Sequence, residues 1–506
     1  MSQQVNSYDF IVVGAGTAGS VVAARLSEDE GARVLLLEAG AAKPPQASAN
    51  PPVWPTLLGS GASWGDTTAV QAATGTAVPF FRGRVIGGSS TINAMVFARG
   101  HRASYAAWGD NGATGWDFDD LLPYFKRSET AFDRDPALRG ANGPMIVAPA
   151  APPNAVLVAC LCAALQRGYS HATDISGGLE EGFGFTDLNI VDGQRQSAAD
   201  GYLIPAMQRP NLDFVAASMV HRLRIEDGRC TGVEYTTGNG HTESVAMAGE
   251  VILTAGAIGS AHLLMVSGVG PQAHLRERGV DVVLDLPGVG SNLHDHPLTP
   301  LVYRAARSVP PGQHNHGELL GLIRSQRADA APDIQIFGVD SADVPGLGGA
   351  GDGYVLGVSV LQPFSRGTVR LTAPTMHTAP AIDPNYFGDD RDMQTMIEGL
   401  RIAREIGTAP ALDTWRAAEM APGLDVADDE ALRRYVQGAF ASYFHPVGTC
   451  AMGDTPDSVV DSALRVHSVN GLRIVDASVM PSIPSNNTVA TVYAIAERGA
   501  DLIRRG

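Results

Sequence analysis

Uninterrupted apolar runs alternate with a helical pattern at the start of the chain. Residues 10–13 (FIVV) and 34–37 (VLLL) contain only apolar side chains, as strands buried on both faces of a parallel sheet do. Between them, residues 21–26 are mostly apolar, contain no proline and permit a helix. The pattern predicts a strand–helix–strand unit whose two strands are neighbours in one sheet.

The pattern changes from about residue 297 to residue 437. Short apolar runs now alternate with turn residues, which is typical of an antiparallel sheet; these runs are residues 334–337, 354–361 and 367–371. A helix follows, because Met393, Met396, Ile397 and Leu400 lie at i, i+3, i+4 and i+7. Elsewhere we predict strands over residues 211–220, 231–235, 250–254 and 472–475, and helices over residues 119–126 and 488–502.

Length and composition indicate a globular protein of two domains, or of one large domain with an elaborated partner. The chain has 506 residues, which exceeds what one hydrophobic core serves, and 44% of them are hydrophobic against 18% charged. The net charge of −17 disfavours nucleic acid and anionic membranes, both of which attract basic surfaces. A strand that begins by Tyr8 leaves little room for a signal peptide, and no apolar run reaches about 18 residues. We therefore expect a cytoplasmic protein.

The four cysteines add no site. Their positions include no C-x-x-C pair, which argues against a zinc site, and they suggest no disulfide framework. Cys160 and Cys162 lie in an apolar, helix-like segment, where small core residues are expected.

The first strand is followed at once by a glycine-rich turn of the form G-x-G-x-x-G. Gly14 suits the tight turn, Gly16 lets the backbone approach a pyrophosphate, and Gly19 lets the helix pack closely on the strand. The amino end of the following helix favours phosphate. Glu38 ends the second strand, at the spacing expected of a carboxylate that binds a ribose hydroxyl. The unit predicts a dinucleotide site, and the fingerprint alone leaves FAD and NAD open.

A second glycine-rich segment, residues 83–100, contains four small residues in a row at positions 87–90 and then Asn93. Small residues allow close backbone approach, and their N–H and hydroxyl groups can bind a ligand. Taken alone, the segment is better explained as an ordinary glycine turn between elements.

Together these motifs resemble the glucose–methanol–choline oxidoreductases, a family of FAD-dependent enzymes that act on alcohols. Residues 83–100 resemble the family's first signature and residues 256–270 the second, with Ala261 where many members have proline. Further matches in the family's order are residues 288–296, 443–450, 475–481 and 487–488, so the resemblance covers nearly the whole chain.

The resemblance implies an α/β fold: a Rossmann-like FAD-binding domain with an inserted substrate domain built on an antiparallel sheet plus helices. We expect residues 1–150, 191–296 and 445–506 to form the FAD-binding domain, and residues 151–190 and 297–444 the substrate-binding domain. FAD would contact Gly14, Gly16, Thr17, Ala18, Gly19, Glu38, Ala39, Trp64, Arg84, Gly87, Gly88, Ser89, Asn93, Ala94, Met95, Val96, Val220, Ala255, Asp476, Ala477, Thr488 and Val489.

Some members of the family attach FAD covalently through a histidine immediately before the asparagine of the first signature. Ile92 occupies that position here and cannot form the bond. We therefore expect FAD to be bound without a covalent link.

By the same resemblance, His445 and Asn487 are the catalytic residues, with Asn486 as the alternative to Asn487. His445 would remove the hydroxyl proton, titrating near neutral pH as a free histidine does, while Asn487 orients the same oxygen. Hydride would pass from the carbon to flavin N5. The predicted reaction is oxidation of a primary alcohol to the aldehyde, with oxygen or another electron acceptor.

Several alternatives remain open. Phe337, Tyr443, Phe444 and Met95 suggest an apolar pocket for an aromatic or otherwise apolar alcohol. Some family members are hydroxynitrile lyases, which keep FAD without redox turnover, and a flavin-binding protein without activity is a third possibility. Residues 340–352 read as a mobile lid or an ordinary surface loop.

Metal and serine-hydrolase chemistry are disfavoured. His294, Asp295 and His296 are too close in sequence to share one helix face around an ion, and we interpret them as a structural motif. No G-x-S-x-G elbow is present.

Overall fold

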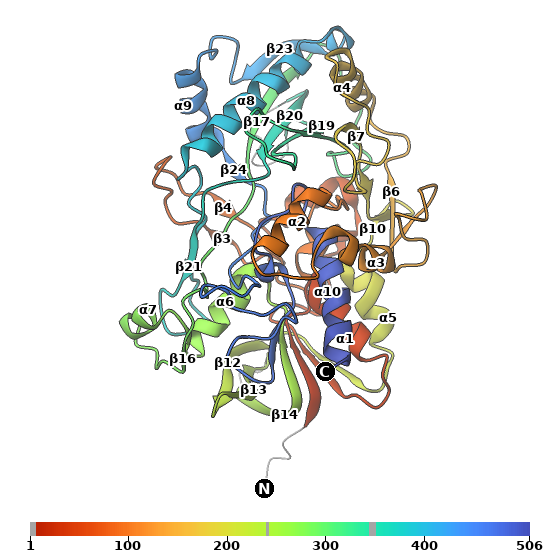
Figure 1. The fold of residues 1–506 in the computed structure, drawn as a ribbon. Helices are drawn as coiled ribbons and strands as arrows, with labels where there is room; N and C mark the ends of the chain where they lie inside the picture. Colours follow the sequence, from red (N-terminus) through yellow and green to blue (C-terminus); the bar gives the residue numbers. More distant parts are fainter. Residues whose placement is uncertain (1–6, 239–241, 344–350) are drawn as a thin grey trace.

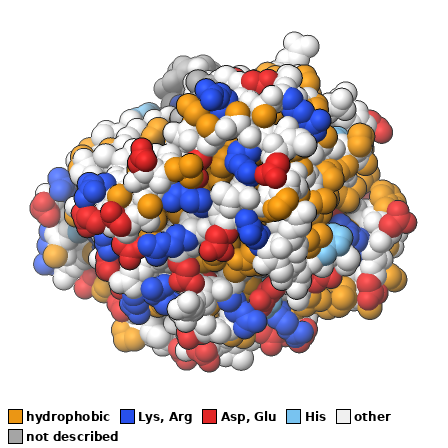
Figure 2. All heavy atoms as spheres, turned by 90° about the horizontal axis from the view of Figure 1, so that it is seen from above, with side chains coloured by type: hydrophobic (Ala, Val, Ile, Leu, Met, Phe, Trp, Pro, Cys, Tyr) orange, Lys and Arg blue, Asp and Glu red, His pale blue; other side chains and the backbone are white. Residues whose placement is uncertain are grey.

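The computed structural model describes residues 7–238, 242–343 and 351–506, and it contains two large sheets, one near each end of the molecule (Figure 1). The middle of the predicted lid, residues 344–350, lies outside the described residues. Among the described helices none is both long and apolar enough to cross a bilayer. On the face shown in Figure 2, basic side chains lie interspersed among acidic ones.

The parallel sheet is built around the unit predicted at the start of the chain. Five of its strands run parallel in the order β11 (Leu212–Val215), β2 (Val34–Leu37), β1 (Tyr8–Val13), β14 (Thr242–Leu253) and β25 (Leu472–Ile474). All four residues of β2 are buried, which explains its uninterrupted apolar run. Helix α1 (Thr17–Leu26) joins β1 to β2 and packs against the last helix, α10 (Val489–Arg504).

The strand predicted over residues 211–220 is wrong, because the chain turns in its middle. Strand β11 ends at Val215, and β12 (Met219–Glu226) then pairs with β13 (Arg229–Thr236) in a hairpin that extends β14. Ala217 adopts a φ of 49°, and its N–H donates to the Gly40 carbonyl while that of Ser218 donates to the Glu38 carbonyl. The turn therefore lies against the end of β2.

The second sheet is antiparallel, as the alternating pattern predicted. Its strands lie in the order β23 (Arg416–Ala421), β17 (Pro297–Ala305), β20 (Gly353–Val360), β19 (Ile334–Val339), β18 (Leu319–Ile323) and β7 (Gly182–Phe185), and β24 (Ala441–Ser442) also pairs with β17. Helices α4 (Ala155–Gln166), α8 (Asp390–Gly407) and α9 (Asp429–Ala439) enclose one apolar core with it. The run at residues 367–371 lies outside this sheet: β21 (Thr368–Arg370) pairs with β22 (Ala381–Asp383).

The other helices and strands are short or connect the sheets. They are α2 (Arg102–Asp110), α3 (Phe118–Ser128), α5 (Ile204–Ala206), α6 (Gly256–Val266), α7 (Gln272–Glu277), β3 (Asp66–Thr67), β4 (Pro79–Phe80), β5 (Glu129–Ala131), β6 (Met145–Pro149), β8 (Asp187–Leu188), β9 (Ile190–Val191), β10 (Gln194–Arg195), β15 (Val269–Gly270) and β16 (Leu284–Asp285). The predicted domain boundaries stay a prediction.

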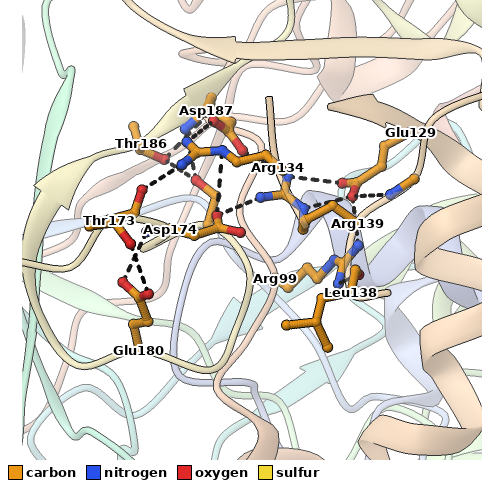
Figure 3. A network of polar contacts seen from close by, with 12 residues as sticks. Arg99, Glu129, Arg134, Leu138, Arg139, Thr173, Asp174, Glu180, Thr186 and Asp187 are labelled. Atoms are coloured by element: carbon orange, nitrogen blue, oxygen red, sulfur yellow. Dashed lines mark hydrogen bonds and ion pairs between the residues drawn. The ribbon is translucent and has the colours of Figure 1, made fainter. Parts of the chain in front are cut away.

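A buried network of ion pairs fastens β5 to β8 (Figure 3). Arg139 contacts Glu129 at 2.7 Å and Asp187 at 2.7 Å, and Arg99 contacts Glu129 at 2.6 Å. Although burial opposes its charge, Arg99 and Arg139 hold the pKa of Glu129 below its usual range. The Asp187 carbonyl also accepts from Phe97 N–H. The network is therefore joined to the end of residues 83–100, the first-signature segment.

Candidate active site

A cavity of about 660 Å³ lies where the carboxyl ends of the parallel strands meet the antiparallel sheet. Val13, Gly14 and Glu38 line it from the parallel sheet, and Phe337 and Val339 of β19 line it from the opposite side. Ligands of open α/β sheets bind outside the carboxyl ends of the strands, so the cavity occupies the expected place.

The cavity brings together most of the residues that the sequence predicts for the site. Its walls include His445, Asn487, Gly14, Gly16, Thr17, Ala18, Glu38, Ala39, Trp64, Arg84, Gly88, Ser89, Asn93, Ala94, Val96, Val220, Ala255, Asp476, Ala477, Thr488 and Val489.

Three predicted residues lie behind the wall instead. A Cβ at Gly19 would meet the Gly14 carbonyl oxygen at 1.8 Å, and one at Gly87 would meet Thr91 Oγ1 at 2.4 Å, so both glycines serve close packing. Met95 is fully buried and does not line the cavity, so its assignment to the apolar pocket wall is wrong.

The glycine turn fits a dinucleotide. Gly14 has a φ of +103°, and a Cβ on Gly88 would lie 2.6 Å from Gly16 Cα, so two glycine backbones meet at the cavity wall. Gly16 caps α1 without a side-chain hydrogen bond, and the first turn of α1 contains no acidic residue. The helix end therefore keeps backbone N–H groups for phosphate oxygens.

Glu38 lies at the same end of the cavity. Its Oε2 accepts from Ala15 N–H at 2.9 Å and its Oε1 from Gly40 N–H at 2.7 Å. Burial raises the pKa of Glu38 to about 7. Nearby, the Trp64 ring contacts the guanidinium groups of Arg82 and Arg84, 4.5 and 4.7 Å from its centroid. These groups suit the ribose and base end of a dinucleotide.

His445 is fixed by backbone pairing with the 294–296 segment. Tyr443 N–H donates to the His296 carbonyl at 2.9 Å, and Val447 N–H donates to the His294 carbonyl at 3.0 Å. The buried Asp295 carboxylate accepts from the backbone N–H of His445 at 2.6 Å and from that of His296 at 2.9 Å. The backbone of residues 294 and 296 and the Asp295 carboxylate therefore fix the backbone around His445.

Asn487 faces His445 across the cavity wall. Its Nδ2 lies 3.3 Å from His445 Nε2, while its Oδ1 lies 3.5 Å from Gln335 Nε2. Asn486 is fully buried, and its Oδ1 accepts from Gln335 Nε2 and from Asn487 N–H. Only Asn487 of the two lines the cavity, which favours it as the residue that contacts substrate.

Burial lowers the pKa of His445 to about 3. The expectation that this histidine titrates near neutral pH is therefore wrong, because desolvation penalises the imidazolium. At neutral pH the ring is an uncharged base whose lone pair is available without prior loss of a proton.

His296 is not among the predicted site residues. Its ring nitrogen Nδ1 lies 3.0 Å from His445 Nδ1, although 149 residues separate the two in sequence. In the sequence, His296 is marked only by its place in the 294–296 motif, and that motif does not reveal that His445 is its neighbour. Across the described residues, no group of three or more His, Cys, Asp or Glu side chains is arranged to hold a metal ion.

Comparison with known proteins decides the family. Residues 8–298 match the N-terminal family model of GMC oxidoreductases, and residues 363–496 match the C-terminal one. The chain is a GMC oxidoreductase. The glucose–methanol–choline resemblance is thereby confirmed, as are FAD as the cofactor and a CH–OH group as the donor that this GMC oxidoreductase oxidises.

The GMC oxidoreductase is similar to enzymes with several names. It is 37% identical to human mitochondrial choline dehydrogenase over 99% of this chain and 91% of that protein. It is 35% identical to an alcohol dehydrogenase [acceptor] of Pseudomonas putida over 98% of this chain and 96% of that protein. Among solved structures, pyridoxine 4-oxidase from Mesorbium loti matches with a TM-score of 0.95 and 35% identity, over 99% and 100% of the two chains.

Proposed function

We propose that the enzyme oxidises a neutral primary alcohol attached to an aromatic or otherwise apolar group, and releases the aldehyde. The observation that carries the proposal is the aromatic wall beside His445. Phe337 and Tyr443 stack with centroids 5.0 Å apart and planes at 26°, and Phe444 contacts Phe81 at 5.5 Å. All four rings line the cavity. Such surfaces suit a flat apolar ring.

The carboxylates of the described cavity wall favour an uncharged substrate. They belong to Glu38, Asp66 and Asp476. Glu38 bonds backbone N–H groups, Asp66 pairs with Arg82, and Asp476 accepts from Gly256 N–H and from the Ser260 hydroxyl. A quaternary ammonium such as choline would find aromatic rings but no free carboxylate beside His445 among these residues.

The roles of the chain's own residues follow from their geometry. His445 Nε2 takes the hydroxyl proton, and Asn487 Nδ2 donates to the same oxygen and sets its direction. FAD supplies the hydride acceptor when it is bound at the glycine turn.

Anaerobic mixing of the FAD-loaded enzyme with a panel of alcohols tests the proposal. The panel contains benzylic, furanic and pyridine-type methanols, aliphatic alcohols, choline and sugar alcohols, and loss of the oxidised-flavin absorbance is followed. We expect arylmethanols to reduce the flavin at least about tenfold more efficiently than choline, as one or two well-matched apolar contacts allow. Fastest reduction by choline or a sugar alcohol would contradict the substrate class.

Two further outcomes are informative. Admitting air to the reduced enzyme distinguishes an oxidase, which reoxidises quickly, from a dehydrogenase that needs another acceptor. Flavin that stays oxidised with every alcohol would favour the hydroxynitrile lyase alternative.

A further inference from the structure

A second histidine ring lies directly behind His445, on the side away from Asn487. The rings of His296 and His445 are nearly perpendicular, at 88°, with centroids 5.2 Å apart. Their Nδ1 atoms are 3.0 Å apart, which is hydrogen-bond distance. A bond between two ring nitrogens needs one protonated donor and one unprotonated acceptor.

The far side of His296 decides which ring donates. His296 Nε2 lies 3.1 Å from the Leu361 carbonyl oxygen, and a carbonyl can only accept. His296 Nε2 therefore carries a hydrogen. The ring is fully buried, and burial holds the pKa of His296 well below its usual range, so it is neutral and has one N–H. Its Nδ1 must then be an acceptor.

The tautomer of His296 determines the tautomer of His445. Since His296 Nδ1 accepts, His445 Nδ1 donates, and the neutral His445 ring has no hydrogen left for Nε2. That atom therefore has a lone pair, which accepts a hydrogen bond from the Asn487 Nδ2 amide at 3.3 Å. In the other tautomer, Nε2 would carry hydrogen and could not take a proton from an alcohol.

The geometry of the pair is set by the backbone. Asp295 accepts from the backbone N–H groups of both histidines, and the Tyr386 and Ser442 hydroxyls bond its second oxygen. The His445 ring also contacts the Tyr443 ring at 4.6 Å. These contacts fix the backbone that carries both rings but do not choose a tautomer. The bonds from the Leu361 carbonyl through His296 choose it, and Asn487 Nδ2, a donor 3.3 Å from His445 Nε2, favours the same tautomer.

We propose that His296 is a positioning residue that holds His445 in the Nδ1–H tautomer, with the Nε2 lone pair directed at the alcohol. That this tautomer serves alcohol oxidation rests on the proposed function. The hydrogen-bond assignment itself stands on the distances between His296, His445 and Leu361.

Nitrogen-15 NMR of the FAD-loaded enzyme with labelled histidine tests the tautomer directly. The signals of His445 are those lost in His445→Gln. We expect a protonated Nδ1 and an unprotonated Nε2 in the natural protein, and a mixture of tautomers in His296→Leu. His294→Leu is the matched control, because His294 is equally buried but bonds the Asn292 carbonyl and Ile483 N–H. It should leave the His445 signals unchanged even if stability falls.

Flavin reduction at saturating alcohol gives the kinetic readout. We expect His296→Leu to lower the limiting rate by at least about 10-fold, a part of the 10²–10⁴ that a general base contributes. The alcohol dissociation constant should change less than about 2-fold, because His296 does not line the cavity. The limiting rate of His296→Asn should lie between those of the natural enzyme and His296→Leu. The asparagine amide oxygen can accept the same hydrogen bond, but nothing fixes its orientation.

Two results would overturn the inference: a hydrogen on His445 Nε2 in the natural protein, or unchanged tautomer and rate in His296→Leu. The NMR result also separates this inference from the proposed function. If no alcohol reduces the natural enzyme, the proposed function fails, while the tautomer measurement still decides the role of His296.

Discussion

His445 Nε2 and Asn487 Nδ2 lie 3.3 Å apart in the cavity wall, brought together from positions 42 residues apart in sequence. The first is a base and the second a donor, so an alcohol oxygen placed beside both gives up its hydrogen to one and accepts a hydrogen bond from the other. The pair therefore defines where the reacting oxygen lies.

Replacing His445 with alanine removes the base and leaves the cofactor contacts in place. We expect His445→Ala to purify with FAD and to reduce its flavin at least about 100-fold more slowly with the best alcohol. Stopped-flow absorbance measures the rate. His467→Ala is the control, since His467 bonds the Gly453 carbonyl and lies outside the cavity wall. A near-normal rate in His445→Ala with FAD intact would remove His445 from the mechanism.

The pH dependence of the same rate follows from the low pKa of His445. A base acts in its unprotonated form, and with a pKa of about 3 His445 stays unprotonated across the range in which the protein can be studied. We expect the limiting rate of flavin reduction to be flat from about pH 5 to pH 9, with loss of activity only as pH falls toward the pKa. Titration of the His445 ring nitrogens near pH 6.5, followed by their nitrogen-15 signals, would show that the histidine titrates as a free one does. A rate inflection alone would not, because burial also raises the pKa of Glu38 to about 7 and that of Asp295 to about 6.

The contact between Gly88 and Gly16 predicts the effect of a single methyl group. Gly88→Ala puts a Cβ 2.6 Å from Gly16 Cα at a residue with a φ of +56°. Strain of this kind costs about 1–3 kcal/mol, and relief would move the wall of the dinucleotide site. We expect the variant to lose at least about 10-fold in FAD affinity, measured by titration of the apoprotein. Gly61→Ala is the control, because nothing lies within 4 Å of its added Cβ.

The buried ion network predicts a large effect on stability. Glu129→Gln leaves Arg99 and Arg139 without their shared carboxylate, and removing one partner of a buried pair costs about 3–5 kcal/mol. Asp119→Asn breaks an exposed pair with Arg102, whose two side chains are 72% and 52% accessible, and should change stability by less than about 0.5 kcal/mol. Urea unfolding of the two variants compares them. Equal midpoints would mean that the network contributes little.

Ile92 lines the cavity at the position where a covalent link would require histidine. We expect acid precipitation to leave a colourless pellet and a yellow supernatant, because nothing ties the flavin to the chain there. A pellet that stays yellow after washing would show a covalent bond at another residue.

The parts of the fold that could be predicted are those fixed by local pattern. The unit from β1 to Glu38 follows from apolar runs and three glycines, and the helix containing Met393 and Leu400 follows from its spacing. The break at Ala217 could not be predicted in this way. It depends on hydrogen bonds to the Gly40 and Glu38 carbonyls, which residues 217 and 218 meet only after folding.

The site shows the same division. His445 and Asn487 could be named from a family resemblance, but no sequence pattern places His296 Nδ1 beside His445. The pKa of His445 could not be predicted either, since it depends on desolvation by segments distant in sequence. Met95 is apolar and adjoins the cavity-lining Ala94 and Val96, yet its backbone at a φ of 59° accompanies a side chain buried behind the wall.

Pro297 of β17 pairs with Ser442 of β24, so the segment that supplies every strand of the antiparallel sheet except β7 begins and ends at adjacent points, one residue from His296 and three from His445. The two rings thus lie beside the point where residues 297 and 442 pair. Phe337 belongs to the segment between these two residues. Changes within this segment can reshape the wall that an alcohol meets, while His445, the proton acceptor, stays held outside it. Selectivity and proton abstraction are therefore separable in this architecture, which makes the enclosed segment the natural target for altering which alcohols the enzyme accepts.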